Sequence, residues 1–250
     1  MQELRIIPVP VAAEIRPEDS LAHILLNALR QCRLALRKGD VLVVKHKIVS
    51  KSEGRFVLLE SVKTTPASRA WGKRYKVDAR VIELALRESK SIIRRKNGVL
   101  ITETHHGFIC ANSGIDVSNV DGGEHALLLP KDPDSSARKL YAEIRKLTGI
   151  SIPIIISDSF GRPWRDGLTE AAIGVAGMKA IHDYRGRSDP HGYSLRVTLD
   201  AVADELACAA GLLSSKLTRT PFVIIRGFPY QPGRGSSRSL LRPAKQDLFR

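Results

Sequence analysis

Three polar segments of this chain carry residues that could do chemistry, and each follows or flanks a hydrophobic run. The first spans 46–55 and places His46, Lys47 and Lys51 directly after the apolar residues 41–44. Ammonium and imidazole groups clustered at a strand end could bind phosphate oxygens. An ordinary basic surface loop explains the same residues equally well, so this segment alone leaves both readings open.

The second segment, 111–120, offers oxygen ligands. It contains the carboxylate of Asp116 and the amide of Asn119, and Gly114 lets the backbone bend close to a ligand. Such donors suit Mg²⁺, which takes a few protein oxygens and completes its shell with phosphate and water. The alternative is an Asx-turn, in which these side chains only cap their own backbone. Taken by itself, this segment favours the turn.

The third segment, 157–165, follows the most apolar run of the chain, 152–156. Ligand sites in α/β proteins commonly lie at the carboxyl ends of such buried strands. Asp158 and the Ser159 hydroxyl are candidate metal ligands, and Arg162 and Arg165 could hold an anionic substrate. Asp–Arg pairs that tie down the turn are the alternative, but here the residues favour function.

Together these segments indicate an enzyme that handles metal and phosphate. The chain has no G-x-x-x-x-G-K-[ST] sequence, no G-x-G-x-x-G after a strand and no G-x-S-x-G elbow, which disfavours P-loop, dinucleotide-binding and hydrolase readings. The adjacent His105 and His106 lack companion ligands, and we interpret them as an exposed or hydrogen-bonded pair.

Strands and helices alternate along the chain without the regularity of a βαβ array, which predicts an α+β or mixed α/β fold. Turn residues such as Asn97-Gly98 separate the periodic segments. Strands are predicted at 4–9, 41–44, 56–59, 91–94, 99–102, 152–156, 171–175, 195–199 and 222–225, and helices at 21–32, 77–89, 133–147 and 200–213.

The composition restricts the partners. The net charge is +14 with a pI near 10.0, but the cations are dispersed and no basic block interleaved with aromatic residues appears, so specific nucleic-acid binding is disfavoured. No apolar run is long enough for a membrane span, and we expect a soluble, cytoplasmic protein. Three scattered cysteines are expected to be buried thiols rather than disulfides or zinc ligands.

Several long motifs, in order, resemble the coenzyme F420-0:L-glutamate ligase (F420 γ-glutamyl ligase) family nearly from end to end. They are G-D-V-L-V-V-K-H-K-I-V-S-K-S-E-G-R (39–55), N-S-G-I-D-V-S-N-V (112–120), L-L-L-P-K-D-P-D-S-S-A (127–137), S-D-S-F-G-R-P-W-R-D-G (157–167), A-A-I-G-V-A-G (171–177), V-A-D-E-L-A (202–207) and R-P-A-K-Q-D-L-F-R (242–250).

The resemblance implies one ligase-like unit over 1–250, built of two subdomains with discontinuous boundaries and a largely antiparallel sheet, and forming an intertwined homodimer. We expect no nitroreductase-like extension of the kind that some relatives carry. The implied reaction joins L-glutamate to the lactyl carboxylate of coenzyme F420-0 through an acyl phosphate, and further γ-linked glutamates can follow. GTP would be the cosubstrate, with Mg²⁺ or Mn²⁺ and K⁺ as cofactors.

The same resemblance assigns roles to residues. Asp116 and Asp158 match metal ligands and would be catalytic, Ser159 matches a second-metal hydroxyl position usually held by Thr, and His46, Lys47, Lys51 and Asn119 match nucleotide contacts. Substrate anchoring by Arg162 and Arg165 is our inference from the residues rather than from the family.

One loop departs from the family pattern. Relatives carry a glycine-rich, in some cases acidic, loop before the last strand, whereas this chain reads S-S-K-L-T-R-T-P at 214–221. Either Lys216 contacts phosphate directly or nucleotide use is altered. The alternatives to the ligase are therefore a paralogue with another amino acid or acceptor, and a non-catalytic protein that binds deazaflavin or polyanions.

Overall fold

A five-stranded sheet forms the centre of the molecule in the computed structural model, which describes residues 3–118, 120, 122–215 and 217–248. Its strands lie in the order β1-β12-β2-β8-β9. They span Arg5–Val9 (β1), Phe222–Arg226 (β12), Val41–Lys45 (β2), Ile154–Arg162 (β8) and Arg165–Ala176 (β9). Within this sheet only β2 and β8 pair in parallel, and the other neighbours are antiparallel.

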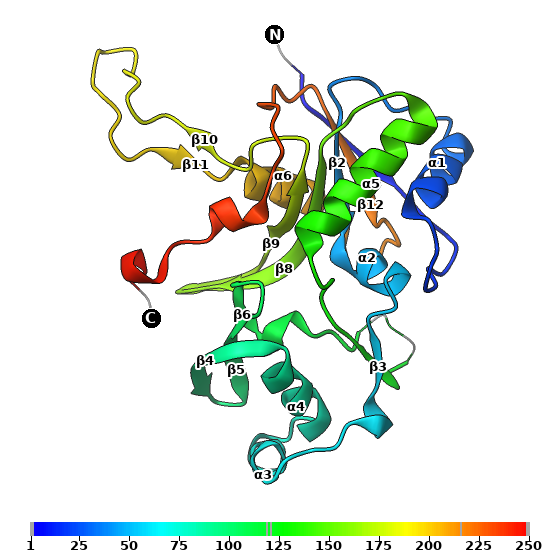
Figure 1. The fold of residues 1–250 in the computed structure, drawn as a ribbon, viewed down its shortest axis with the longest axis vertical. Coiled ribbons are helices and arrows are strands. Elements are labelled where there is room, and N and C mark those ends of the chain that lie inside the picture. The colour runs from blue at the N-terminus through cyan, green and yellow to red at the C-terminus, as the bar shows by residue number, and fades with distance from the viewer. Residues whose placement is uncertain (1–2, 119, 121, 216, 249–250) are drawn as a thin grey trace.

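The central strands are almost continuously Val, Leu and Ile because both of their faces are covered. Successive side chains point to opposite faces, so Leu42 and Val44 join one hydrophobic cluster while Val41 and Val43 join the other. Two helices, α1 (Leu21–Gln31) and α5 (Pro133–Thr148), pack on the first cluster, and α6 (Val202–Gly211) packs on the second (Figure 1).

Local signals explain where the covering helices begin and end. The N-cap of α1 is Ser20, whose hydroxyl accepts from the His23 amide and donates to Glu143 of α5 at 2.6 Å. Asp132 caps α5 ahead of Pro133, and Gly149 ends it in the left-handed conformation. These contacts fix both helices against one face of the sheet.

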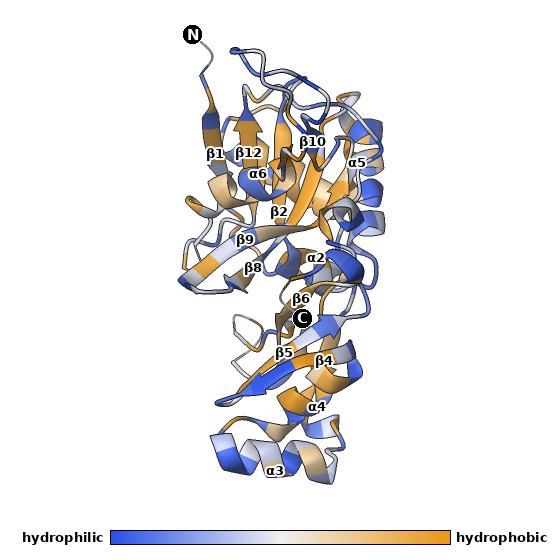
Figure 2. Ribbon diagram, turned by 90° about the vertical axis from the view of Figure 1, so that its left-hand side faces the viewer, coloured by the Kyte–Doolittle hydropathy of each residue, from blue (hydrophilic) through white to orange (hydrophobic). Residues whose placement is uncertain are grey.

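Residues 56–127 form the opposite end of the molecule, with α3 outermost (Figure 2). This segment has hydrophobic clusters of its own, one around Leu84 and one around Leu100. Its elements are β3 (Phe56–Leu58), η1 (Leu59–Ser61), α3 (Pro66–Tyr75), α4 (Ala79–Arg87), β4 (Ser89–Lys96), β5 (Val99–Thr104), β6 (Ile109–Ala111), η2 (Asn112–Gly114) and β7 (His125–Leu127). Separate clusters agree with two subdomains, whose boundaries stay a prediction.

Short elements complete the fold. The helix α2 (His46–Ser52) follows β2 directly, and a two-stranded ribbon of β10 (His182–Asp183) and β11 (Leu199–Asp200) closes the long arm between β9 and α6. The 3₁₀ helices η3 (Ser237–Leu240) and η4 (Ala244–Gln246) lie near the C-terminus. In the part of the chain that the structure describes, every helix is too short or too polar to cross a bilayer.

The structure confirms the mixed α/β class and the largely antiparallel sheet, and it corrects several boundaries. The predicted loop at 46–52 is a helix, because Ile48 and Val49 bury against the central cluster. The predicted loop after residue 156 is strand as far as Arg162, because β9 pairs with it. The predicted strand at 195–199 is reduced to Leu199–Asp200, and α3 was not predicted. The dimer stays a prediction.

Candidate functional site

A cleft of about 730 Å³ opens at the carboxyl end of β2, where its parallel pairing with β8 ends. Five parts of the chain surround it: residues 11–15, the start of α2, the segment with Asp116, the β8–β9 hairpin and the segment 211–221. The parallel register pairs Lys45 with Ser157, so the residues that follow them, His46 and Asp158, lie side by side. The cleft therefore brings together segments that are far apart in the sequence.

The His46–Asp158 pair lies at this edge. His46 Nε2 is 3.1 Å from Asp158 Oδ1, and the imidazole is only 4% exposed. The buried Nδ1 of His46 has no hydrogen-bond partner within the described residues. Asp158 Oδ1 also accepts the Ser159 amide at 2.7 Å. The imidazole and the amide thus hold the carboxylate in place.

Glu170 of β9 lies opposite Ser159 in the hairpin register. Its carboxylate is 10% exposed and accepts from three groups: Lys45 Nζ at 2.5 Å and the hydroxyls of Ser157 and Ser159 at 2.8 Å each. Charge-assisted hydrogen bonds of this length are strong and directional. A largely buried, fully paired carboxylate therefore joins the end of β2 to the middle of β8 and β9.

Asp116 enters the cleft from the far side. Its backbone bridges to Leu127 with two hydrogen bonds, which fix the position of the side chain. Lys47 Nζ is 2.6 Å from Asp116 Oδ2, and the amide and hydroxyl of Ser118 both donate to Oδ1 at 2.7 Å. Burial opposes ionisation, but the bonds from Lys47 and Ser118 outweigh it and hold the pKa of Asp116 below its ordinary value.

A fourth ion pair joins Lys51 to Glu14 at the mouth of the cleft. Lys51 is buried on α2, whereas Glu14 is largely exposed. The three lysines on β2 and α2, which are Lys45, Lys47 and Lys51, and the imidazole of His46 therefore each face a carboxylate of their own.

The donors suit a hard divalent cation. Asp116, Asp158 and Ser159 offer oxygens alone, the donor type that Mg²⁺ and Mn²⁺ prefer over the nitrogen and sulfur of a zinc site. Over the described residues no three His, Cys, Asp or Glu side chains form a metal-binding group by themselves. A metal here would complete its shell with phosphate and water, as Mg²⁺ commonly does.

The structure brings together most of the residues predicted from the sequence. His46, Lys47, Lys51, Asp116, Asp158 and Ser159 all line the same cleft. Asn119 and Lys216 lie outside the described residues, although Ser215 lines the cleft. Arg162 and Arg165 are exposed where β8 turns into β9 and do not line it; Arg162 donates to the Asp166 carbonyl at 3.2 Å. Their role in substrate anchoring stays a prediction.

Sequence reasoning did not identify Glu170, Lys45 and Ser157. The only sequence signal was Lys45, a charged residue at the border of an apolar run. Without the hairpin register nothing places Glu170 beside Ser159.

The adjacent histidines are hydrogen-bonded, as we interpreted them from the sequence: His105 to the Arg87 carbonyl and His106 to the Pro130 carbonyl.

The cysteines follow the prediction only in part. Cys110 is buried, and burial raises the pKa of its thiol to about 12. Cys208 is half-buried, and Cys32 is exposed because it caps the C-terminus of α1 instead of packing in the core. All three thiols are free.

Known proteins resemble this chain over most of its length. The model of the family F420-0:Gamma-glutamyl ligase matches residues 11–227, which include every cleft residue named above. The coenzyme F420:L-glutamate ligase of Methanothermobacter thermautotrophicus is 43% identical over 235 residues, which cover 93% of both chains. The ligase of the same name from Methanopyrus kandleri is 38% identical over 252 residues, covering 99% of this chain and 98% of its own.

Proposed function

This chain belongs to the F420-0:gamma-glutamyl ligase family, and from that premise we propose that it is a coenzyme F420-0:L-glutamate ligase that uses GTP. The observation that carries the proposal is the convergence of Asp116, Asp158 and three nucleotide-binding candidates in one cleft. The product would be the amide between glutamate and the lactyl carboxylate of the deazaflavin, to which further γ-linked glutamates could be added.

The proposed reaction has two displacements. An oxygen of the acceptor carboxylate attacks the γ-phosphorus of GTP, the bond from that phosphorus to the bridging oxygen breaks, and GDP leaves. The glutamate amine then attacks the acyl carbon of the acyl phosphate, inorganic phosphate leaves and the amine nitrogen loses a proton. Positioning and charge neutralisation supply most of the catalysis in reactions of this kind.

His46, Lys47 and Lys51 would contact the phosphates, because their nitrogen atoms lie at the cleft edge formed by α2. Asp116, Asp158 and Ser159 would hold Mg²⁺ or Mn²⁺, which when bound neutralises charge on the phosphate oxygens. No described residue is assigned to K⁺, and the homodimer likewise stays a prediction. Hydrogen bonds already hold the side chains of all three metal-ligand candidates.

The existing ion pairs imply an exchange of partners when substrates bind. Lys47 neutralises Asp116 and His46 contacts Asp158 in the structure. Phosphate groups would draw these cations away, and the freed carboxylates would then accept the metal. Binding of the nucleotide would therefore favour binding of the metal, and the reverse, because the same ion pairs must break for both to bind.

The segment before β12 favours one alternative. Ser214, Ser215 and Thr220 line the cleft where relatives carry a glycine-rich, in some cases acidic, loop. Hydroxyls there would contact a nucleotide differently from backbone amides or a carboxylate. A paralogous ligase with another amino acid or acceptor is therefore the second candidate.

The proposal is tested by phosphate release from the purified protein with GTP, Mg²⁺, L-glutamate and F420-0, leaving out each component in turn. We expect release only with acceptor and glutamate together, and a deazaflavin product heavier by one glutamyl unit. ATP in place of GTP tests the nucleotide, and other amino acids test the paralogue. Deazaflavin binding without turnover under any combination would contradict the catalytic proposal and favour a binding protein.

A further inference from the structure

We propose that Glu170 is a positioning residue that aims the Ser159 hydroxyl at a bound divalent cation. The inference rests on the proposed function, because it assumes that Ser159 is a metal ligand. Glu170 itself touches neither substrate nor metal in this scheme and acts only through Ser159. Nothing in the sequence motifs singles it out, since its place follows from the β8–β9 register.

The hydrogen-bond inventory sets the direction of the Ser159 hydroxyl. Lys45 Nζ, which can only donate, contacts the Oε1 atom of Glu170, so Oε1 is an acceptor and at 2.8 Å the Ser159 hydroxyl donates its one proton to it. Both lone pairs of Ser159 Oγ are then directed away from Glu170. Because Ser159 lines the cleft, those lone pairs are available to a cation there. A hydroxyl free to rotate would present its proton to the cation part of the time.

Two features hold Glu170 in place. Lys45 Nζ lies 2.5 Å from the same Oε1 atom. Gly211 at the end of α6 packs against the side chain so closely that an added Cβ would lie 2.7 Å from Glu170 Cγ. The carboxylate is therefore held from both sides, as groups supporting metal ligands usually are.

The second serine on the same carboxylate provides a matched control. Ser157 donates to Glu170 Oε2 at the same 2.8 Å and also borders the cleft, but Ser157 is fully buried between β2 and β9, whereas Ser159 is partly exposed. If Glu170 served only to tie the strands together, losing either hydroxyl would matter equally. If it positions a ligand, only the loss of Ser159 would affect metal binding.

The test is a double-mutant cycle read out as Mn²⁺ affinity, measured by electron paramagnetic resonance with a non-hydrolysable GTP analogue present. We expect Glu170→Gln to weaken Mn²⁺ binding roughly 10- to 100-fold, because supporting groups commonly contribute that much to metal affinity. Ser159→Ala should weaken it at least as much. The double variant should bind Mn²⁺ like Ser159→Ala alone, and Ser157→Ala should stay within about twofold of the wild type.

Additive losses in the double variant, or unchanged Mn²⁺ affinity in Glu170→Gln, would overturn the proposal. Should Glu170→Gln fail to fold, Glu170→Asp retains the charge but shortens the reach, and we expect a smaller loss of Mn²⁺ affinity that again vanishes in the Ser159→Ala background. The readout needs no turnover. A wild type that binds Mn²⁺ but does not ligate contradicts the proposed function alone, whereas an active wild type with an additive cycle contradicts this inference alone.

Discussion

Cations are arranged differently in two regions of this molecule, the cleft and the α3–β4 end. In the cleft, Lys45, His46, Lys47 and Lys51 each face a carboxylate. At the other end, residues 63–98 contain eleven Lys and Arg against three Asp and Glu, and thus carry +8 of the total +14.

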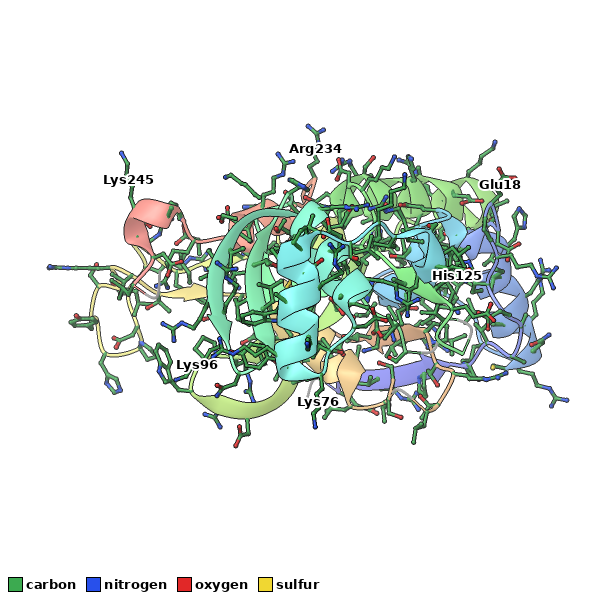
Figure 3. The ribbon with its side chains drawn as sticks, turned by 90° about the horizontal axis from the view of Figure 1, so that it is seen from below. Glu18, Lys76, Lys96, His125, Arg234 and Lys245 are labelled. Carbon is green, nitrogen blue, oxygen red and sulfur yellow. The ribbon has the colours of Figure 1, made fainter. Side chains whose placement is uncertain are left out.

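The three acids of residues 63–98 are already engaged, Asp78 by Arg80, Glu83 by Arg87 and Glu88 by Arg55. Eight exposed cations have no carboxylate partner among the described residues: Lys63, Arg69, Lys73, Arg74, Lys76, Arg94, Arg95 and Lys96. Figure 3, which views the molecule from below, labels Lys76 and Lys96 at this end. The charged groups of the cleft are thus paired with one another, whereas most of the excess positive charge lies at the α3–β4 end. The net charge of the chain therefore does not indicate where the site is.

The largest effect is expected when a carboxylate is removed from the cleft. Asp158→Asn keeps the shape but loses the charge that would hold a metal, and we expect turnover to fall about 10³-fold, since metal stabilisation of transferring phosphate is worth several kcal/mol. The measurement is phosphate release at saturating substrates. Asp78→Asn, which breaks a surface ion pair with Arg80 at the α3–β4 end, is the control and should keep full activity. Equal activity in both variants would contradict the difference between the two regions.

A smaller effect follows from removing the cation that faces Asp116. In Lys47→Met the hydrogen bond that helps to depress the pKa of Asp116 is lost. The acidic limb of kcat/KM should therefore move to higher pH, and the KM for nucleotide should rise roughly tenfold, about 1.4 kcal/mol. pH–rate profiles of wild type and variant test both. An unmoved acidic limb would show that Asp116 does not govern it.

A variant of Glu83 tests whether a charged side chain in the α3–α4 region stabilises the fold. Hydrogen bonding, led by the Thr65 amide with further help from the Thr65 hydroxyl, outweighs burial and lowers the pKa of Glu83 from 4.5 to about 2. Because the folded pKa is depressed, this stabilisation is complete above the unfolded value and is lost as pH falls through about 2.

The corresponding variant is Glu83→Gln. It should unfold about 1 kcal/mol more easily at neutral pH and no more easily than the wild type in strong acid. Urea unfolding across this pH range measures both values, and turnover should be unchanged. A constant difference at all pH values would point to a packing effect instead.

The smallest effect is expected from the unpaired surface cations. Replacing Lys73, Lys76 and Lys96 with Gln should leave turnover unchanged and alter the free energy of unfolding by no more than about 0.5 kcal/mol. Earlier elution from a cation-exchange column would confirm the altered surface. A several-fold loss of turnover in this triple variant would show that the α3–β4 end contributes to the reaction.

Much of the framework could be predicted because its signals are local. The apolar run 152–156 indicates a buried strand, Asn97-Gly98 indicates the hairpin of β4 and β5, and the helices predicted from residues 21 and 133 begin there. The position of Asp158 just after a buried strand placed it at the edge of the sheet where the cleft lies. Signals of this kind depend only on neighbours along the chain.

The remainder depends on tertiary contacts. The helix α2 has seven residues, too few to be stable alone, and it forms because Ile48 and Val49 bury. Glu170 belongs to the site only because β9 folds back on β8 with Ser159 opposite it. Arg162 and Arg165 were predicted from the sequence to anchor the substrate. They lie where the extended hairpin turns and do not line the cleft, which only the paired strands could reveal.

The parallel pairing of β2 with β8 also has a kinetic consequence. Lys45 and Ser157 come together only after more than a hundred intervening residues have been closed into a loop, and such non-local pairings slow folding. The cleft can form only once this loop is closed, so a partly folded chain cannot be active. Recovery of turnover during refolding would therefore time the closure of this loop, whereas far-ultraviolet circular dichroism would report the earlier formation of helices.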